Sequence, residues 1–167
     1  MSNSAFPRER VPLQWVALAL FLLICLGAAG LGAALTNLSV DDWYAALRKP
    51  AWNPPNWLFG PVWTALYIGM AVAAWLVWRN SRRADVRLPL LLFGVQWCLN
   101  VLWSAFFFGL RSPALAFADV VPLWLAILAT IIAFWRVSVW AAALLFPYLA
   151  WVSFATALNA AIWRMNA

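Results

Sequence analysis

Residues 114–135 read ALAFADVVPLWLAILATIIAFW, a continuous apolar run whose one charged residue is Asp119. A helix that crosses a lipid bilayer needs about 20 mainly apolar residues, and this run is long enough. Its apolar residues are continuous and do not alternate with polar ones, so the run is unlike the strand of a membrane barrel. It therefore predicts a transmembrane helix.

Further apolar runs of this kind lie before and after it. The chain is 67% hydrophobic and 10% charged, whereas an average soluble domain is roughly half apolar and a quarter charged. We therefore predict an all-α integral membrane protein. A five-transmembrane-helix bundle forms one domain over residues 13–163, after a polar basic N-terminal segment (1–12) and before a short C-terminal tail (164–167). The predicted helices span residues 13–35, 58–78, 88–110, 114–135 and 139–163.

Serine and proline mark the expected ends and bends of these helices. Ser112 and Ser138 are predicted N-caps, because a serine hydroxyl accepts a hydrogen bond from the free N–H groups at a helix start. Pro113 follows Ser112 at a position where its missing N–H costs little. Pro122 and Pro147 fall inside predicted helices, and we expect each of them to kink its helix.

The net charge is +6, with two cysteines and no histidine. The arginines lie singly or in small groups between the apolar runs, as in loops at a membrane surface, and not in the single basic face of a nucleic-acid-binding protein. We predict the lipid bilayer as a partner and no nucleic acid. Histidine ligation is excluded, and the chain shows no metal-ligand spacing and no hydrolytic constellation. We therefore expect no metal, no cofactor and no acid–base catalysis, whereas photochemistry through tryptophans stays open.

Basic residues are more numerous on one predicted side of the membrane, which places the N-terminus in the cytoplasm by the positive-inside rule. The run over residues 13–35 is longer than the core of a signal peptide, which has roughly 7–15 residues, so we interpret it as a retained helix. The richer side holds Arg8, Arg10, Arg79, Arg82, Arg83, Arg87 and Arg136, and the other side holds Arg48, Lys49, Arg111 and Arg164.

The first connection, residues 36–57, is long, since most loops in compact domains have about 4–6 residues. It contains three prolines and three tryptophans. One interpretation is an interfacial belt that anchors the helices, because tryptophan favours the headgroup region. The other is a lid over a cavity. Composition favours neither of the two.

Helical periodicity places large side chains on shared faces of three predicted helices. Amides on such a face are typical of hydrogen bonds between helices, and the same faces can line a ligand site. The small Ala155 below Trp151 predicts a flat slot beside an aromatic wall. The faces comprise Trp63, Tyr67 and Met70; Gln96, Asn100, Trp103 and Phe107; and Pro147, Trp151, Ala155 and Leu158, with Asn159 beside them.

Two features inside the apolar runs have alternative interpretations. Asp119 is either a buried carboxyl, neutral or hydrogen-bonded, that orders the bundle or a residue with a direct functional role, because an unpartnered acid at membrane depth is costly. Residues 27–34 of the first helix are all glycine or alanine except Leu31. Small residues at a spacing of four let helices approach closely. This face therefore serves either inside the bundle or between protomers.

Four motifs follow one another along the chain and cover nearly all of it after residue 15. They read WYAALRKPAWNPP (43–55), GPVWTALY (60–67), QWCLNVLWS with FFG (96–104 and 107–109) and PYLAWVSFATALN (147–159). In this order they resemble the translocator protein family, also called tryptophan-rich sensory proteins or peripheral-type benzodiazepine receptors. A single motif would be weak support, whereas the ordered set is specific.

The resemblance implies a five-helix bundle, commonly a homodimer, whose ligand pocket is closed by the first loop, and it favours the lid interpretation. It implies a receptor or sensor for protoporphyrin IX, related tetrapyrroles or other hydrophobic small molecules, with a role in porphyrin transport or regulation. Arg48 and Lys49 in the lid are predicted rim charges for the porphyrin propionates. Carried over by motif, the pocket residues are Tyr44, Trp52, Asn53, Trp63, Asn100, Trp103, Trp151, Ala155 and Leu158.

Two other functions stay open. Some family members are reported to promote light-dependent porphyrin degradation, with tryptophans at the positions of Trp63 and Trp151, so one alternative is an enzyme. The other is a structural or regulatory membrane partner that acts through residues 27–34. The cholesterol motif of animal members has a tyrosine where this chain has Ala160, which argues against sterol recognition. The resemblance therefore implies a bacterial member in the cell membrane.

Overall fold

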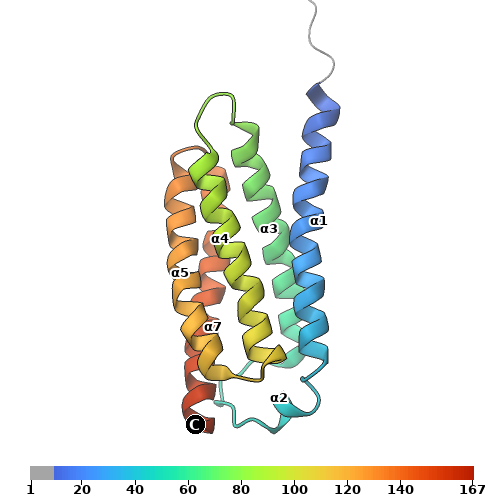
Figure 1. Ribbon diagram of the computed structural model, residues 1–167, viewed down its shortest axis with the longest axis vertical. Coiled ribbons are helices and arrows are strands. Elements are labelled where there is room, and N and C mark those ends of the chain that lie inside the picture. Colours follow the sequence, from blue (N-terminus) through green and yellow to red (C-terminus); the bar gives the residue numbers. More distant parts are fainter. Residues whose placement is uncertain (1–9) are drawn as a thin grey trace, which may run out of the picture.

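The computed structural model describes residues 10–167, so residues 1–9 of the predicted N-terminal segment lie outside the described residues. Between residues 10 and 167 every regular element is a helix. Five of these helices are long and apolar enough to cross a membrane. The predicted all-α architecture, a five-transmembrane-helix bundle, is confirmed (Figure 1).

Four elements form the first part of the chain and five form the second. The first part contains α1 (Arg10–Asn37), the short α2 (Trp43–Ala46), the 3-10 turn η1 (Asn56–Leu58) and α3 (Phe59–Arg79). The second part contains α4 (Arg87–Ser104), the π-helical turn η2 (Ala105–Gly109), α5 (Pro113–Trp135), α6 (Val139–Ala143) and α7 (Phe146–Asn166).

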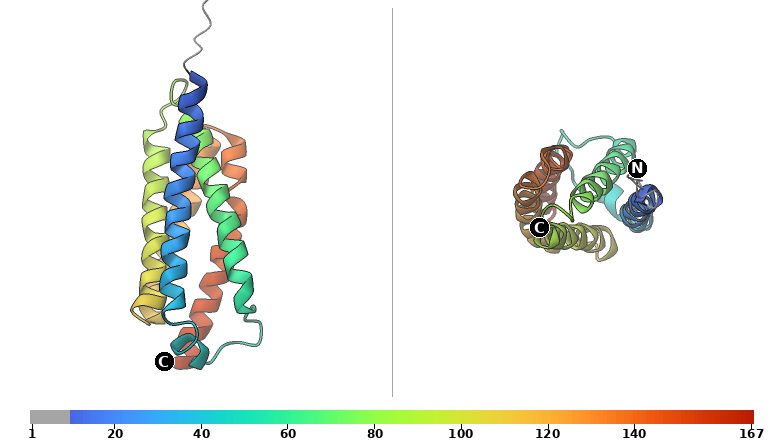
Figure 2. Two further views of the ribbon diagram at one scale, coloured as in Figure 1. Left: turned by 90° about the vertical axis from the view of Figure 1, so that its right-hand side faces the viewer. Right: turned by 90° about the horizontal axis from the view of Figure 1, so that it is seen from above.

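The long helices run up and down in an elongated bundle (Figures 1 and 2). Helix α1 packs mainly on α3, α4 packs on α5, and α5 packs on α7. The first loop with α2, and the end of α7, lie at one end of the bundle, here called the lid end. The start of α1 and the turn between α3 and α4 lie at the opposite end (Figure 2).

The predicted last helix, residues 139–163, is broken in two. Helix α6 ends at Ala143, and α7 begins at Phe146 with Pro147 in its first turn. Proline lacks the N–H that would continue the helix, and its ring crowds the preceding turn. Pro147 therefore interrupts the helix, which is a larger disturbance than the predicted kink. Helix α5, in contrast, continues through Pro122 without a break.

Helix α7 also extends beyond the predicted end, so that the predicted tail over residues 164–167 is helical up to Asn166. The Asn166 side chain explains the extension, because its Nδ2 donates to the Ile162 carbonyl at 2.7 Å. It thereby satisfies one of the carbonyls that a helix end leaves free. The predicted N-caps are confirmed, since Ser112 Oγ accepts from the Leu115 N–H and Ser138 Oγ accepts from the Ala141 N–H, both at 3.3 Å.

On α3, the core of the opposite half of the bundle is built from small and branched residues. Ala71, Ala73, Ala74 and Val77 of α3 are completely buried, and α3 packs between α1 and α6. On α1, Gly32 faces the Ser104 hydroxyl of α4, whereas Gly27 and Gly30 have no neighbouring side chain. The small residues of α1 therefore serve the bundle at Gly32 and leave an open surface at Gly27 and Gly30.

Candidate ligand-binding site

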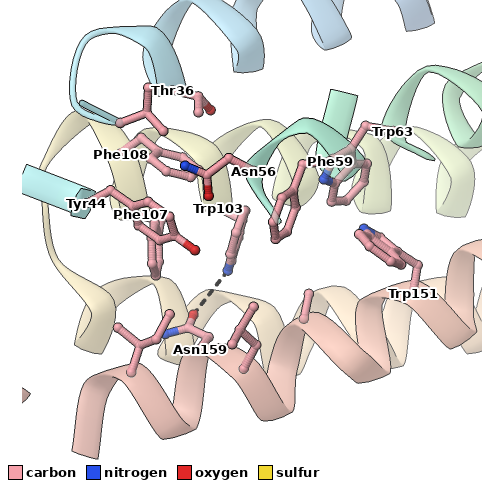
Figure 3. Close-up of a pocket in the computed structure, with 14 residues that line it drawn as sticks. Thr36, Tyr44, Asn56, Phe59, Trp63, Trp103, Phe107, Phe108, Trp151 and Asn159 are labelled. Atoms are coloured by element: carbon pink, nitrogen blue, oxygen red, sulfur yellow. Dashed lines mark hydrogen bonds between the residues drawn. The ribbon is translucent and has the colours of Figure 1, made fainter. Parts of the chain in front are cut away.

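A cavity of about 100 Å³ lies at the lid end, enclosed by the first loop, α3, the end of α4 and α7 (Figure 3). Half of its lining residues are aromatic, with rings contributed by every one of these elements. Indole and phenyl rings offer a large apolar surface with few rotatable bonds. The lining residues are Thr36, Val40, Tyr44, Asn56, Phe59, Trp63, Trp103, Phe107, Phe108, Trp151, Ala155, Leu158, Asn159 and Ile162.

Most of the predicted pocket residues meet at this cavity, although they come from four separate elements. Trp63 and Trp151 approach it from α3 and α7 on one side, and Trp103 lies apart from them, beyond Phe59 (Figure 3). The predicted slot beside Trp151 is therefore part of a wall in which the small Ala155 leaves space. The predicted residues that line the cavity are Tyr44, Trp63, Trp103, Trp151, Ala155 and Leu158.

Trp52, Asn53 and Asn100 do not line this cavity. The Trp52 ring is half exposed and lies edge-on to Phe154, with 5.7 Å between the ring centroids. The Asn53 amide oxygen accepts a hydrogen bond from the Tyr44 hydroxyl at 3.1 Å, so that Asn53 orients a residue that does line the cavity. Asn100 is buried in the bundle, where it accepts from the Tyr67 hydroxyl and donates to the Tyr148 hydroxyl at 3.0 Å.

A hydrogen-bond chain fixes the plane of Trp103. Its Nε1 donates to Asn159 Oδ1 at 3.2 Å, and Asn159 Nδ2 in turn donates to the Pro113 carbonyl at 2.8 Å (Figure 3). Phe107 stacks on the Trp103 ring with a centroid distance of 5.2 Å and an interplanar angle of 19°. This wall is therefore rigid before any ligand arrives.

The π-helical turn η2 explains why two successive phenylalanines reach the cavity. Its register is seen in the Leu110 N–H, which donates to the Ala105 carbonyl five residues earlier at 2.8 Å. The wider turn places both Phe107 and Phe108 at the cavity, and π-bulges are frequent at functional sites. In a regular α-helix Phe108 would not share the face of Trp103 and Phe107, so helical periodicity does not predict its place at the cavity. Phe59 could have been found, because it lies one turn before Trp63 on the same face.

The indole of Trp151 contributes a buried, unpaired polar group to this wall. Its Nε1 is buried without a hydrogen-bond partner in the described structure, and Phe59 lies edge-on to its ring at a centroid distance of 5.9 Å. A buried N–H without an acceptor costs about 1–3 kcal/mol. An acceptor atom of a ligand can bind this donor once the side chains that cover it move.

A groove of about 460 Å³ adjoins the cavity between α1, α3 and α4. The two spaces share Trp63, Trp103 and Phe108 among their walls, whereas Asn100 and Tyr67 line the groove and not the cavity. Sites for small molecules usually have about 300–1,000 Å³. The cavity is smaller than this range and the groove lies within it, so a large ligand fits only if the wall between them or the loop above them moves.

Two polar contacts fasten the first loop over the cavity. Arg111 Nη2 and Asp42 Oδ2 form an ion pair at 3.2 Å between the loop and the α4–α5 connection. Arg111 has φ 52°, a left-handed conformation that is uncommon for a residue other than glycine. At the second contact, the Arg48 N–H donates to Asn166 Oδ1 at 3.0 Å and Asn166 Nδ2 donates to the Arg48 carbonyl at 2.9 Å.

Titratable groups of the loop respond to these contacts. A hydrogen bond from the Trp43 N–H lowers the pKa of the Asp42 carboxyl, and the nearby Arg111 lowers it further. Burial raises the pKa of the Tyr44 hydroxyl, against a smaller opposing effect of its hydrogen bond to Asn53. At neutral pH the loop therefore presents a charged Asp42 to Arg111 and a neutral Tyr44 to the cavity.

The predicted rim cations lie in the loop but do not line the cavity. Lys49 Nζ lies 4.7 Å from the centre of the Tyr44 ring and donates to the carbonyls of Ala45 and Leu47, both at 3.1 Å. The Arg48 backbone is bound to Asn166, and its side chain is exposed. Lys49 therefore contacts Tyr44, a residue that lines the cavity, whereas the Arg48 backbone helps to hold the loop in place.

The described residues contain no cluster of three metal-ligating side chains. Asp119 is buried in α5 and does not line the cavity. One of its carboxyl oxygens has no hydrogen-bond partner in the described structure. This placement argues against a direct role of Asp119 in this cavity.

Comparisons with known proteins agree with the arrangement of the chain. The sequence model of the TspO/MBR family matches residues 20–164. A tryptophan-rich protein TspO of Chlorobaculum tepidum is 44% identical over 154 residues, which cover 92% of this chain and 98% of that protein. The human translocator protein is 44% identical over 128 residues, which cover 74% of this chain and 75% of that protein. A tryptophan-rich sensory protein of Cereibacter sphaeroides is 38% identical over 154 residues, 92% of this chain and 94% of that protein.

Proposed function

Because the chain belongs to the TspO/MBR family and is an integral membrane protein, we propose that it is a receptor for a flat tetrapyrrole such as protoporphyrin IX. The ligand binds beneath the first loop, in the cavity and the groove that adjoins it. Binding there serves the sensing, transport or regulation of porphyrin. The lipid bilayer is the solvent of the bundle.

The observation that carries the proposal is the unpaired Trp151 N–H in a wall of aromatic rings. A flat macrocycle packs well against indole and phenyl faces, and each aromatic pair adds about 0.5–1.5 kcal/mol beyond the burial of its area. A carboxylate or carbonyl oxygen of the ligand accepts from Trp151. The buried donor is then satisfied, which favours the bound state over the empty one.

The size of the cavity requires that the loop moves on binding. About 100 Å³ is too small for a macrocycle, whereas the adjoining groove supplies about 460 Å³. The loop is held by an exposed ion pair and by hydrogen bonds at Asn166, which are weak enough to open and reform. The propionates then lie at the loop, where Lys49 and Arg48 supply positive charge.

The test is an equilibrium titration of the detergent-purified protein with protoporphyrin IX in the dark, read from the absorbance of the porphyrin. Trp151→Ala removes the donor and a wall, and Ala155→Leu fills the slot. We expect each to weaken binding about tenfold or more, the loss of one or two good contacts. Trp140→Ala is the matched control, because Trp140 is 78% exposed on α6 and does not line the cavity. Unsaturable binding that is equal in all four proteins would mean that porphyrin only partitions into the micelle.

The rim charges are tested in the same titration. Reversal of both charges by Arg48→Glu and Lys49→Glu is expected to weaken the binding of protoporphyrin more than that of an uncharged aromatic ligand. The reason is that only the porphyrin has carboxylates to pair with the loop. Equal losses for the two ligands would remove Arg48 and Lys49 from the proposal while leaving the aromatic site in place.

The proposal includes a homodimer in a bacterial cell membrane with the N-terminus in the cytoplasm. Gly27 and Gly30 of α1 have no neighbouring side chain among the described residues, and Leu23 and Leu31 are exposed on the same helix. Such a surface is typical of helices that approach one another closely in lipid. Cross-linking in membranes through a cysteine at Leu23 would detect the dimer, and reporter fusions at the C-terminus would fix the orientation.

A further inference from the structure

A second hollow lies at the opposite end of the bundle, far from the lid. It is a groove of about 630 Å³ between the start of α1 and the end of α3 with the turn that follows. It shares no lining residue with the cavity beneath the loop. The residues that line it are Leu13, Gln14, Leu76, Trp78, Arg79, Asn80, Ser81, Arg82 and Arg83.

One wall of this groove is held by a stack of three side chains. The Trp15 and Trp75 rings are stacked with 6.1 Å between centroids, and the Arg79 guanidinium lies 4.5 Å from the centre of the Trp75 ring. Trp75 Nε1 donates to the Gln14 carbonyl at 3.0 Å, which fixes the indole against α1. A guanidinium stacked by its face keeps the N–H groups at its edge free to donate.

The charge around the groove is strongly one-sided. Arg79, Arg82 and Arg83 line it, and none of them pairs with a carboxylate among the described residues. Asp85 is the acid nearest in sequence, and its Oδ1 accepts from the backbone N–H of Arg87 at 3.0 Å. Three guanidinium groups in one hollow match the oxygens of a phosphate, with which arginine forms paired hydrogen bonds.

The remaining walls are apolar and open towards lipid. Leu13 is 59% exposed, and Leu76 and Trp78 lie on the side of α3 that continues the groove. The hollow lies where membrane-spanning segments end, which is the level of the lipid headgroups. Its occupant therefore needs a phosphate at one end and a hydrocarbon chain at the other, a description that a phospholipid fits and a soluble phosphate does not.

We propose that this groove is a binding site for an anionic phospholipid. The Arg79, Arg82 and Arg83 side chains bind the phosphate, and the acyl chains lie along α1 and α3 beside Leu13 and Leu76. Basic pockets between membrane helices bind anionic headgroups in this manner. The site is independent of the tetrapyrrole site, because the two share no residue and lie at different ends of the bundle (Figure 1).

The test compares lipids on the whole protein in nanodiscs made from equal amounts of phosphatidylglycerol and phosphatidylcholine. Native mass spectrometry after release counts the lipids that stay bound. We expect the parent protein to retain phosphatidylglycerol in preference to phosphatidylcholine. Each arginine that is removed, in Arg79→Gln and in the double variant Arg82→Gln with Arg83→Gln, should lower this preference about fivefold. Trp75→Leu keeps every charge but removes the stacking face, and it is expected to lower the preference by a smaller amount.

The matched control is Arg136→Gln. It removes the same charge at the same end of the bundle, but Arg136 follows α5 and does not line the groove. An equal loss with Arg136→Gln would overturn the site, because the preference would then come from the general positive charge of this surface. Displacement of the lipid by millimolar inorganic phosphate would overturn the lipid as occupant. Helical circular dichroism equal to that of the parent protein shows that each variant is folded, so that a lost preference counts for the proposal whatever the porphyrin titration gives.

Discussion

The two halves of the bundle use the same helices in opposite ways. In the second half of α3, Ala71, Ala73 and Ala74 are completely buried between α1 and α6. In its first half, the same helix presents Phe59 and Trp63 to a cavity. Small side chains let helices approach until no space is left, whereas large rings hold them apart and cannot fill every gap between them.

This difference indicates which half of the bundle can rearrange to admit a ligand. The interior of the opposite half, away from the groove at its end, is closely packed around α3 and allows little adjustment. The lid half is closed by a loop that polar contacts join to residues distant in the sequence. These contacts are the Asp42–Arg111 ion pair and the hydrogen bonds between Arg48 and Asn166. The loop also packs Trp43 and Tyr44 on Phe107, but a loop opens locally at a lower free-energy cost than a closely packed core. A binding site that must admit a large ligand therefore belongs at the lid end.

The largest expected effect comes from the same enlargement in each half. Ala74→Leu adds three carbons where Ala74 is completely buried, and overpacking of this kind costs about 1–3 kcal/mol. Ala155→Leu adds the same atoms beside a cavity, so we expect a change within about 0.5 kcal/mol. The free energy of unfolding in mixed micelles, followed by helical circular dichroism during titration with a denaturing detergent, measures both. Equal losses in the two variants would mean that the halves are packed alike.

The sequence predicts the five helices well because each is specified locally, by its apolar length and by caps such as Ser112 and Ser138. It also brings together most of the cavity wall, since Trp151, Ala155 and Leu158 share one face of a regular helix. The register of η2 could not be predicted, because a π-helical turn departs from the α-helical periodicity that the sequence shows.

The fastening of the loop could not be predicted for a different reason. Arg48 and Asn166 are 118 residues apart in the chain, and no local pattern links an exposed backbone to an amide near the end of the last helix. The role of Asn53 is similar, since its contact with the Tyr44 hydroxyl depends on how the loop folds back on itself. Motifs identify which residues belong to a site, whereas the folded chain decides which of them line the cavity and which orient a neighbour.

A smaller effect is expected from loosening the loop at its end. Asn166→Ala removes both hydrogen bonds to the Arg48 backbone. Each such bond contributes about 0.5–1.5 kcal/mol, so local opening should become about tenfold more frequent. Hydrogen–deuterium exchange of the segment around Arg48 measures this opening. Asn80→Ala is the control, because Asn80 also donates to a helix carbonyl, that of Leu76 at 2.8 Å, but at the opposite end. Unchanged exchange in Asn166→Ala would mean that the loop is closed by its aromatic contacts alone.

The smallest expected effect is a pH dependence of the same opening at Asp42. The closed loop lowers the pKa of Asp42 below its ordinary 3.8, through the Trp43 N–H first and Arg111 second. A carboxyl with a lowered pKa stabilises the closed state above its ordinary pKa, and this stabilisation is lost as the pH falls through the lower value. Exchange protection of residues 42–47, corrected for the intrinsic rate, should therefore stay constant from neutral pH to about 5 and fall below about 4. Asp42→Asn should remove this fall, whereas Asp41→Asn should keep it. An identical acid response in all three proteins would assign the loss to other carboxyls and would leave the ion pair at 3.2 Å without a part in holding the lid.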